Sequence, residues 1–83
     1  MVHNPYGEHY MKVYASKSTK ALVDRYNEII KEGYTWVRAI EINSIRQIFR
    51  NRHIDISAIG YSDFWAPKKI AFDNDENCIF IIE

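Results

Sequence analysis

The clearest periodic pattern of apolar residues lies between Ser18 and Gly33, where hydrophobic positions recur every three or four residues. The apolar positions are Leu22, Val23, Tyr26, Ile29 and Ile30. This spacing places them on one face of an α-helix, and that face requires cover from the rest of the chain. Ser18 can accept a hydrogen bond from a first-turn amide, and Gly33 can adopt the left-handed conformation that ends many helices. The sequence therefore predicts a helix over residues 18–33.

Two segments that flank this helix have the pattern of β-strands. Apolar and polar side chains alternate over residues 10–16, and residues 35–42 are rich in strand formers and directly follow the helix stop. A strand, helix, strand unit results, with parallel strands and a right-handed crossover if the two strands are neighbours in one sheet. An alternative interpretation takes Trp36, Ile40 and Ile48 as the apolar side of a second long helix. The strand propensity of these residues favours the first interpretation.

Further elements are predicted in the second half of the chain. Ser44 is followed three residues later by a glutamine, the form of a capping box, which predicts a short helix over residues 44–52. Alternating isoleucines predict a strand over residues 53–59. Two apolar segments, residues 68–72 and 78–82, are separated by polar turn residues, which predicts a C-terminal β-hairpin.

The fold class expected from these elements is α+β. Residues 1–9 contain Pro5 and Gly7 and show no periodicity, so they predict a flexible N-terminal arm in front of a single domain over residues 10–83. The expected architecture is a mixed β-sheet of about five strands with two helices packed on one face, a βαβ start and a C-terminal β-hairpin.

Composition and charge limit the classes of function. With 83 residues the chain can form one domain with a small core. Lysine plus arginine equals aspartate plus glutamate at 11 each, so no overall field attracts nucleic acid or an anionic membrane. Cys78 is the only cysteine, which fits a reducing compartment. No apolar run approaches the ~20 residues that span a bilayer, and the start lacks a signal-peptide pattern, so we expect a cytoplasmic protein without membrane contact.

Metal and cofactor sites have little support in the sequence. Residues 73–77 offer carboxylate and amide oxygens, but they lack the spacing and the central glycine of a calcium-binding EF-hand loop. His3, Glu8 and His9 lie on the expected arm, where nothing holds them in a binding geometry. We therefore expect neither a metal nor a cofactor.

Three aromatic residues lie close together in a segment bounded by Gly60 and Pro67, namely Tyr61, Phe64 and Trp65. Aromatic side chains of this kind can form a protein-binding hot spot, or they can stack on nucleic-acid bases beside a phosphate-binding charge. A third interpretation is that Phe64 and Trp65 fold back as a lid on the small core. All three interpretations remain open from the sequence.

The last apolar segment predicts self-association. Residues 78–82 form an uninterrupted apolar run, so both faces of this strand require cover, whereas helices on one face cover only half of its side chains. The aromatic segment or a second copy of the protein could cover the other face. The run also lacks the lysine, proline or bulge that protects many exposed strand edges. We expect a homodimer with Phe80 or Ile82 near the contact.

Basic residues indicate a second kind of partner. Arg46 and Arg50 are four residues apart on the predicted short helix, so they would be neighbours on one face, where guanidinium groups could bind successive phosphates. The alternative is an ordinary solvated helix face. The full set of candidate nucleic-acid-binding residues is Arg46, Arg50, Arg52, His53, Lys68 and Lys69.

The function expected from these patterns is that of a small non-catalytic binding or regulatory protein that acts through protein–protein contacts, with a protein partner of unknown identity and with self-association. The alternative is a module that binds RNA or single-stranded DNA. A third possibility is a ribonuclease-like toxin, because His53, Arg46, Arg50 and Tyr61 match the composition of small RNA-cleaving toxins, although no family motif is present. No catalytic residue is assigned.

Overall fold

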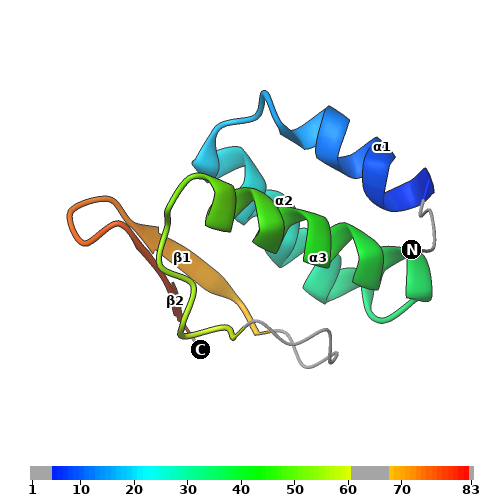
Figure 1. Cartoon of the computed structure of the whole chain (residues 1–83). Helices are drawn as coiled ribbons and strands as arrows, with labels where there is room; N and C mark the ends of the chain where they lie inside the picture. The colour runs from blue at the N-terminus through cyan, green and yellow to red at the C-terminus, as the bar shows by residue number, and fades with distance from the viewer. Residues whose placement is uncertain (1–4, 61–67, 83) are drawn as a thin grey trace.

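The computed structural model describes residues 5–60 and 68–82, which form three α-helices and one antiparallel β-hairpin. Figure 1 shows α1 and α2 lying against α3, and the hairpin on the side of α2 away from α1. The core fills the space between α2, α3 and the hairpin. The elements are α1 (Pro5–Tyr14), α2 (Thr19–Glu32), α3 (Trp36–Asn51), β1 (Ile70–Asp73) and β2 (Cys78–Ile81).

The helix predicted over residues 18–33 is confirmed as α2. The Ser18 hydroxyl accepts a hydrogen bond from the Ala21 N–H at 3.1 Å, which satisfies one of the unpaired first-turn amides. At the other end, Gly33 has a φ of 89° and donates its N–H to the Ile29 carbonyl. The apolar face of α2 is buried against α3 and the hairpin.

The strand predicted over residues 10–16 is wrong, because α1 covers residues 5–14. Pro5 suits the first turn of a helix, where its missing N–H costs nothing. Met11 and Tyr14 are three residues apart and pack on the core from one face of α1. Residues 5–9, for which the sequence predicts a flexible arm, form the first half of α1, and residues 1–4 lie outside the described residues.

The prediction of a strand over residues 35–42 followed by a short helix over 44–52 is also wrong, because one long helix, α3, covers both segments. Thr35 caps its start by accepting a hydrogen bond from the Arg38 N–H at 3.1 Å. Ser44 caps nothing, since it lies inside the helix and donates its hydroxyl to the Ile40 carbonyl. The helical spacing of the isoleucines, buried against α2, overrides their preference for strands.

The five-stranded mixed sheet is corrected to a two-stranded antiparallel hairpin in the part of the chain that the structure describes. The strand predicted over residues 53–59 is reduced to one parallel bridge between Asp55 and Cys78. Ile54 and Ile56 still alternate inward as the pattern implies. The C-terminal hairpin is confirmed, and the fold is a small α+β arrangement of three helices and one hairpin.

No helix among residues 5–60 and 68–82 is long and apolar enough to cross a bilayer. The aromatic residues Tyr61, Phe64 and Trp65 lie outside the described residues, so their predicted roles in binding remain predictions.

Candidate protein interface

The register of the hairpin decides which backbone groups face outward. Ile70 lies opposite Ile81 in the antiparallel pair. The next pair along the hairpin is Lys69 and Ile82. The Ile82 N–H donates to the Lys69 carbonyl at 3.0 Å, so the backbone groups of this pair point toward the opposite strand. Because the direction alternates along an antiparallel pair, the outward N–H and C=O groups are those of Ile70 and Phe72 on β1 and of Ile79 and Ile81 on β2.

The outer edge of β1 is closed at Ile70 by a side chain of α2, whereas the outward groups of Phe72 have no hydrogen-bond partner in the described residues. The Ile70 N–H donates to Oδ1 of Asn27 at 2.8 Å, and Nδ2 of Asn27 donates to the Ile70 carbonyl at 2.9 Å. The carboxamide therefore pairs with both outward groups of Ile70 as the backbone of a further strand would. Asn27 was not identified from the sequence, because its partner is 43 residues away along the chain.

The outer edge of β2 is closed at its start and open at its end. The Ile79 N–H donates to the Asp55 carbonyl at 2.8 Å, and the Asp55 N–H donates to the Asn77 carbonyl at 3.0 Å. Beyond this point, the N–H and C=O groups of Ile81 have no hydrogen-bond partner in the described residues. Ile81 thus has on β2 the position that Ile70 has on β1, but no side chain of residues 5–60 or 68–82 closes it.

Apolar side chains surround this open edge. Ile79 is buried in the core, so the alternation of strand side chains places Phe80 and Ile82 on the opposite face of the hairpin. The exposed fractions are 40% for Phe80, 41% for Ile81 and 48% for Ile82. We call these three residues the β2 surface. Both hairpin residues that the sequence predicts to lie near a partner, Phe80 and Ile82, belong to it.

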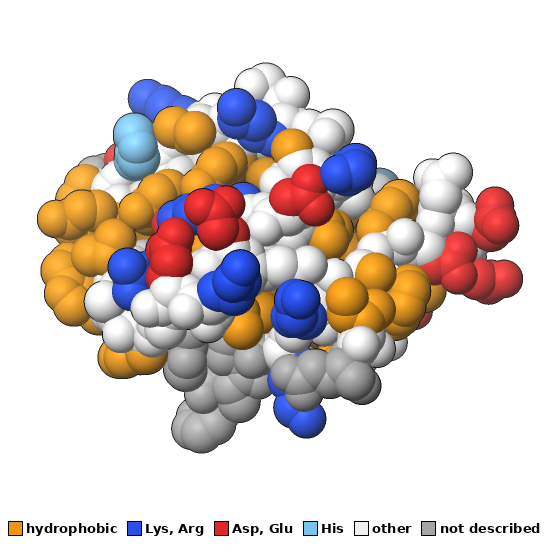
Figure 2. All heavy atoms as spheres, turned by 180° about the vertical axis from the view of Figure 1, so that it is seen from behind, with side chains coloured by type: hydrophobic (Ala, Val, Ile, Leu, Met, Phe, Trp, Pro, Cys, Tyr) orange, Lys and Arg blue, Asp and Glu red, His pale blue; other side chains and the backbone are white. Residues whose placement is uncertain are grey.

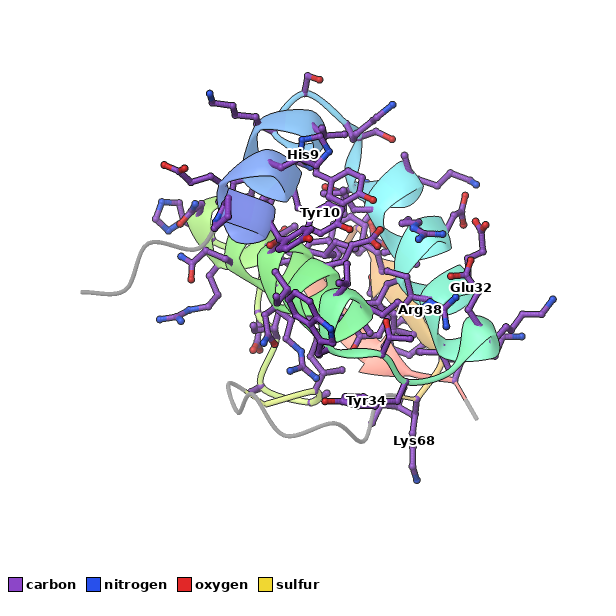
Figure 3. All side chains as sticks on the ribbon, turned by 90° about the vertical axis from the view of Figure 1, so that its right-hand side faces the viewer. His9, Tyr10, Glu32, Tyr34, Arg38 and Lys68 are labelled. Atoms are coloured by element: carbon purple, nitrogen blue, oxygen red, sulfur yellow. The ribbon has the colours of Figure 1, made fainter. Side chains whose placement is uncertain are left out.

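Charge is distributed unevenly along the hairpin. Its turn carries Asp73, Asp75 and Glu76, and the side-chain oxygen of Asp73 accepts hydrogen bonds from the N–H groups of the other two residues. Figure 2 shows acidic side chains gathered at the tip of the hairpin, beside exposed hydrophobic ones. The opposite end carries Lys68 and Lys69, and Figure 3 shows Lys68 pointing away from the body of the protein. Glu83 follows β2 in the sequence, so the open end is basic by two lysines against one carboxylate, and the turn is acidic.

Two of the predicted nucleic-acid-binding residues are engaged inside the fold. The side chain of Arg52 donates to the backbone carbonyls of Ala15 and Lys17 and to the hydroxyl of Thr19, which ties the end of α3 to the α1–α2 connection. Arg46 is only 8% exposed, so its guanidinium does not belong to a surface ridge.

The remaining candidates for nucleic-acid binding lie on the surface in two places. Arg50 and His53 are exposed and line an open hollow of about 410 Å³ that Asp55 also lines. Lys68 and Lys69 are exposed at the start of the hairpin. Nucleic-acid binding by these residues stays a prediction.

A buried ionic cluster connects the three helices and was not found from the sequence. Glu41 of α3 is 3% exposed and accepts two hydrogen bonds from Arg25 of α2, at 2.6 Å from Nε and 3.1 Å from Nη2. The Tyr14 hydroxyl of α1 donates to the same carboxylate. Arg25 also contacts the carboxylate of Glu32, which pairs with Arg38 at 3.1 Å; Figure 3 shows the latter two side chains together.

Two groups of the ionic cluster, Tyr14 and Arg25, have raised pKa values. Burial and the hydrogen bond to Glu41 raise the pKa of Tyr14 to about 12. The hydrogen bond to Glu41 raises the pKa of the Arg25 guanidinium above its usual value. Groups with such pKa values do not exchange protons near neutral pH, which favours a structural role for the cluster over acid–base chemistry.

The environment of Cys78 does not activate its thiol. Partial burial, together with the carboxylates of Asp73, Asp55 and Glu76, raises the pKa of Cys78 above its usual value. A reactive cysteine requires the opposite shift, because the thiolate is the nucleophile.

Comparisons with protein-family models, with curated proteins and with solved structures found no match for this chain. The interpretation of the β2 surface therefore depends on the geometry of the chain itself.

Proposed function

We propose that this protein is a small non-catalytic binding or regulatory protein, which acts through protein–protein contacts and associates with a second copy of itself through the β2 surface. The observation that carries the proposal is the exposure of Phe80 and Ile82 beside each other on the face of the hairpin that the helices do not cover. Clustered apolar side chains at a protein surface are characteristic of interaction sites.

The chemistry of the β2 surface favours a protein over a nucleic acid. Residues 78–82 carry no charged side chain, and the cores of protein interfaces are depleted in charge and enriched in aromatic residues such as Phe80. Binding to nucleic acid depends on cations that neutralise phosphates. Two of the predicted cations, Arg46 and Arg52, make internal contacts instead. A cytoplasmic location belongs to the same proposal, because a single protonated thiol is suited to a reducing compartment.

Light scattering coupled to size-exclusion chromatography tests the proposal. The wild-type chain should have twice its mass of 9.9 kDa at micromolar concentration, and Ile82→Lys should shift it toward the monomer, because a lysine cannot be buried against an apolar partner. Val13→Lys is the matched control, since Val13 is 40% exposed on α1. This control should leave the dimer unchanged. A wild-type monomer throughout the micromolar range would contradict the proposal.

A further inference from the structure

We propose that the two copies join as strands: β2 of each copy pairs antiparallel with β2 of the other about a two-fold axis at Ile81, which makes one four-stranded sheet. This inference rests on the proposed function, because it specifies how the second copy occupies the β2 surface. Association through the apolar faces of the two hairpins, without strand pairing, is the competing arrangement.

The open backbone groups of Ile81 carry the inference. Its N–H and C=O point away from β1 and have no hydrogen-bond partner in the described part of the chain. A strand edge in this state is a template for another strand. At a two-fold axis, Ile81 and the partner's Ile81 would each donate one N–H and accept one, so two hydrogen bonds would satisfy all four groups.

The neighbouring contacts set the register. Asp55 already occupies the outer edge of β2 at Ile79, so the free edge begins at Phe80. Centring the pair on Ile81 places Phe80 directly opposite the partner's Ile82, and the reciprocal contact forms on the other side of the axis. Directly opposed side chains on one face of an antiparallel pair lie within packing distance. The two exposed residues therefore cover each other.

Charge complementarity favours a second copy of this chain as the added strand. No charge lies within residues 78–82, so a two-fold axis there brings no like charges together. At the open end of the hairpin Lys68 and Lys69 outnumber the single carboxylate of Glu83, and the turn is acidic, with Asp73, Asp75 and Glu76. Antiparallel pairing runs the basic end of each hairpin alongside the acidic end of the other. A parallel arrangement would instead bring like ends together.

The backbone of Ile81 can be changed by chemical ligation at the single cysteine. A recombinant thioester of residues 1–77 joined to a synthetic peptide of residues 78–83 regenerates the full chain with its native Cys78. The peptide carries an N-methyl group on Ile81, which removes an N–H that β1 does not use. The dissociation constant of the dimer, measured by analytical ultracentrifugation, should rise by at least about tenfold relative to the unmodified ligated chain. Circular dichroism checks that the fold is retained.

A charge exchange tests the antiparallel direction independently. Lys68→Glu and Lys69→Glu combined with Asp75→Lys and Glu76→Lys exchange the charges of the two ends of the hairpin. In antiparallel pairing each end meets the opposite end of the other copy, so the exchanged variant should dimerise with itself, and an equimolar mixture with the wild type should form few heterodimers in native mass spectrometry. Parallel pairing would favour the heterodimer instead, because like ends would then meet. Asp73 is left unchanged because it orders the turn.

The outcomes separate the two proposals. If the N-methylated chain dimerises as tightly as the unmodified ligated chain while Ile82→Lys is monomeric, strand pairing is overturned and the β2 surface remains the interface. If the exchanged variant forms heterodimers with the wild type in preference to homodimers, the antiparallel arrangement is overturned, and this result is sufficient even if N-methylation disrupts the hairpin. If the wild type is monomeric, the proposed function itself fails.

Discussion

The two edges of the C-terminal hairpin are built from similar apolar strands but end differently. At the outer edge of β1, Asn27 of α2 binds both backbone groups of Ile70, and only those of Phe72, next to the turn, lack a partner in the described residues. At the outer edge of β2, Asp55 binds Ile79, and the groups of Ile81 remain without a partner in the described residues. The composition of a strand therefore does not reveal whether its edge is open. The neighbouring element decides, since one carboxamide on α2 can substitute for a strand.

The largest expected effect on stability comes from Glu41→Gln, a substitution in the ionic cluster that alters neither edge of the hairpin. Glu41→Gln should lower the free energy of unfolding by about 2–4 kcal/mol, because it leaves Arg25 without its buried carboxylate. Urea denaturation measures this loss. Glu28→Gln is the matched control, since it removes an exposed carboxylate 3.4 Å from the same guanidinium and should cost less than about 0.5 kcal/mol.

Neither change touches the hairpin, so the folded Glu41→Gln protein should dimerise as the wild type does. A dimer that weakens in proportion to stability would show that association depends on the whole fold and not on the β2 surface.

The part of the β1 edge that Asn27 closes, at Ile70, can be opened by Asn27→Leu. The substitution leaves the N–H and C=O of Ile70 without partners in a partly buried place, which should cost about 2 kcal/mol of unfolding free energy. The newly open edge should also produce species larger than a dimer in light scattering. Asn51→Leu, at an exposed position at the end of α3, should do neither. An unchanged unfolding free energy for Asn27→Leu would mean that the carboxamide does not close the edge.

Alkaline pH should weaken the helical layer without involving either edge. The pKa of Tyr14 is about 12 in the folded protein against 10.0 for an unperturbed tyrosine, so the folded state binds the proton more tightly. The stability from this group is complete below pH 10 and is lost as the pH rises toward 12. The loss should be about 1 kcal/mol after solvent screening, and Tyr14→Phe should remove it from urea midpoints measured against pH. An identical pH dependence in Tyr14→Phe would assign the loss to another group.

The smallest effect on stability is expected at the open edge. Ile82→Lys should change the unfolding free energy of the monomer by less than about 0.5 kcal/mol, because the side chain is half exposed and packs on little of the same chain. Urea denaturation at a concentration below dimerisation measures it. A loss comparable to that of Asn27→Leu would mean that Ile82 belongs to the core of one chain, and the contrast between the two edges would disappear.

Local signals were sufficient for two elements. The helix at α2 has a cap at each end and one continuous apolar face, and the hairpin has two apolar segments around a polar turn. These features act within a few residues of one another, so the sequence alone predicts them. The apolar run of residues 78–82 also predicts that one face of this strand lacks cover within the chain. It does not indicate which backbone groups of the strand are open.

Tertiary contacts decided the rest. Isoleucines at residues 42, 45 and 48 suit a strand by propensity and a helix by spacing, and only burial against α2 selects the helix. The closure of the β1 edge joins Asn27 to Ile70, and the ionic cluster joins Tyr14, Arg25 and Glu41 from three helices. The sequence determined the ends of α2 and the position of the hairpin turn, but it also predicted a break near residue 43 that lies inside α3. Which backbone groups remain open to a partner depended on atoms brought together from distant positions, and no local pattern encodes such contacts.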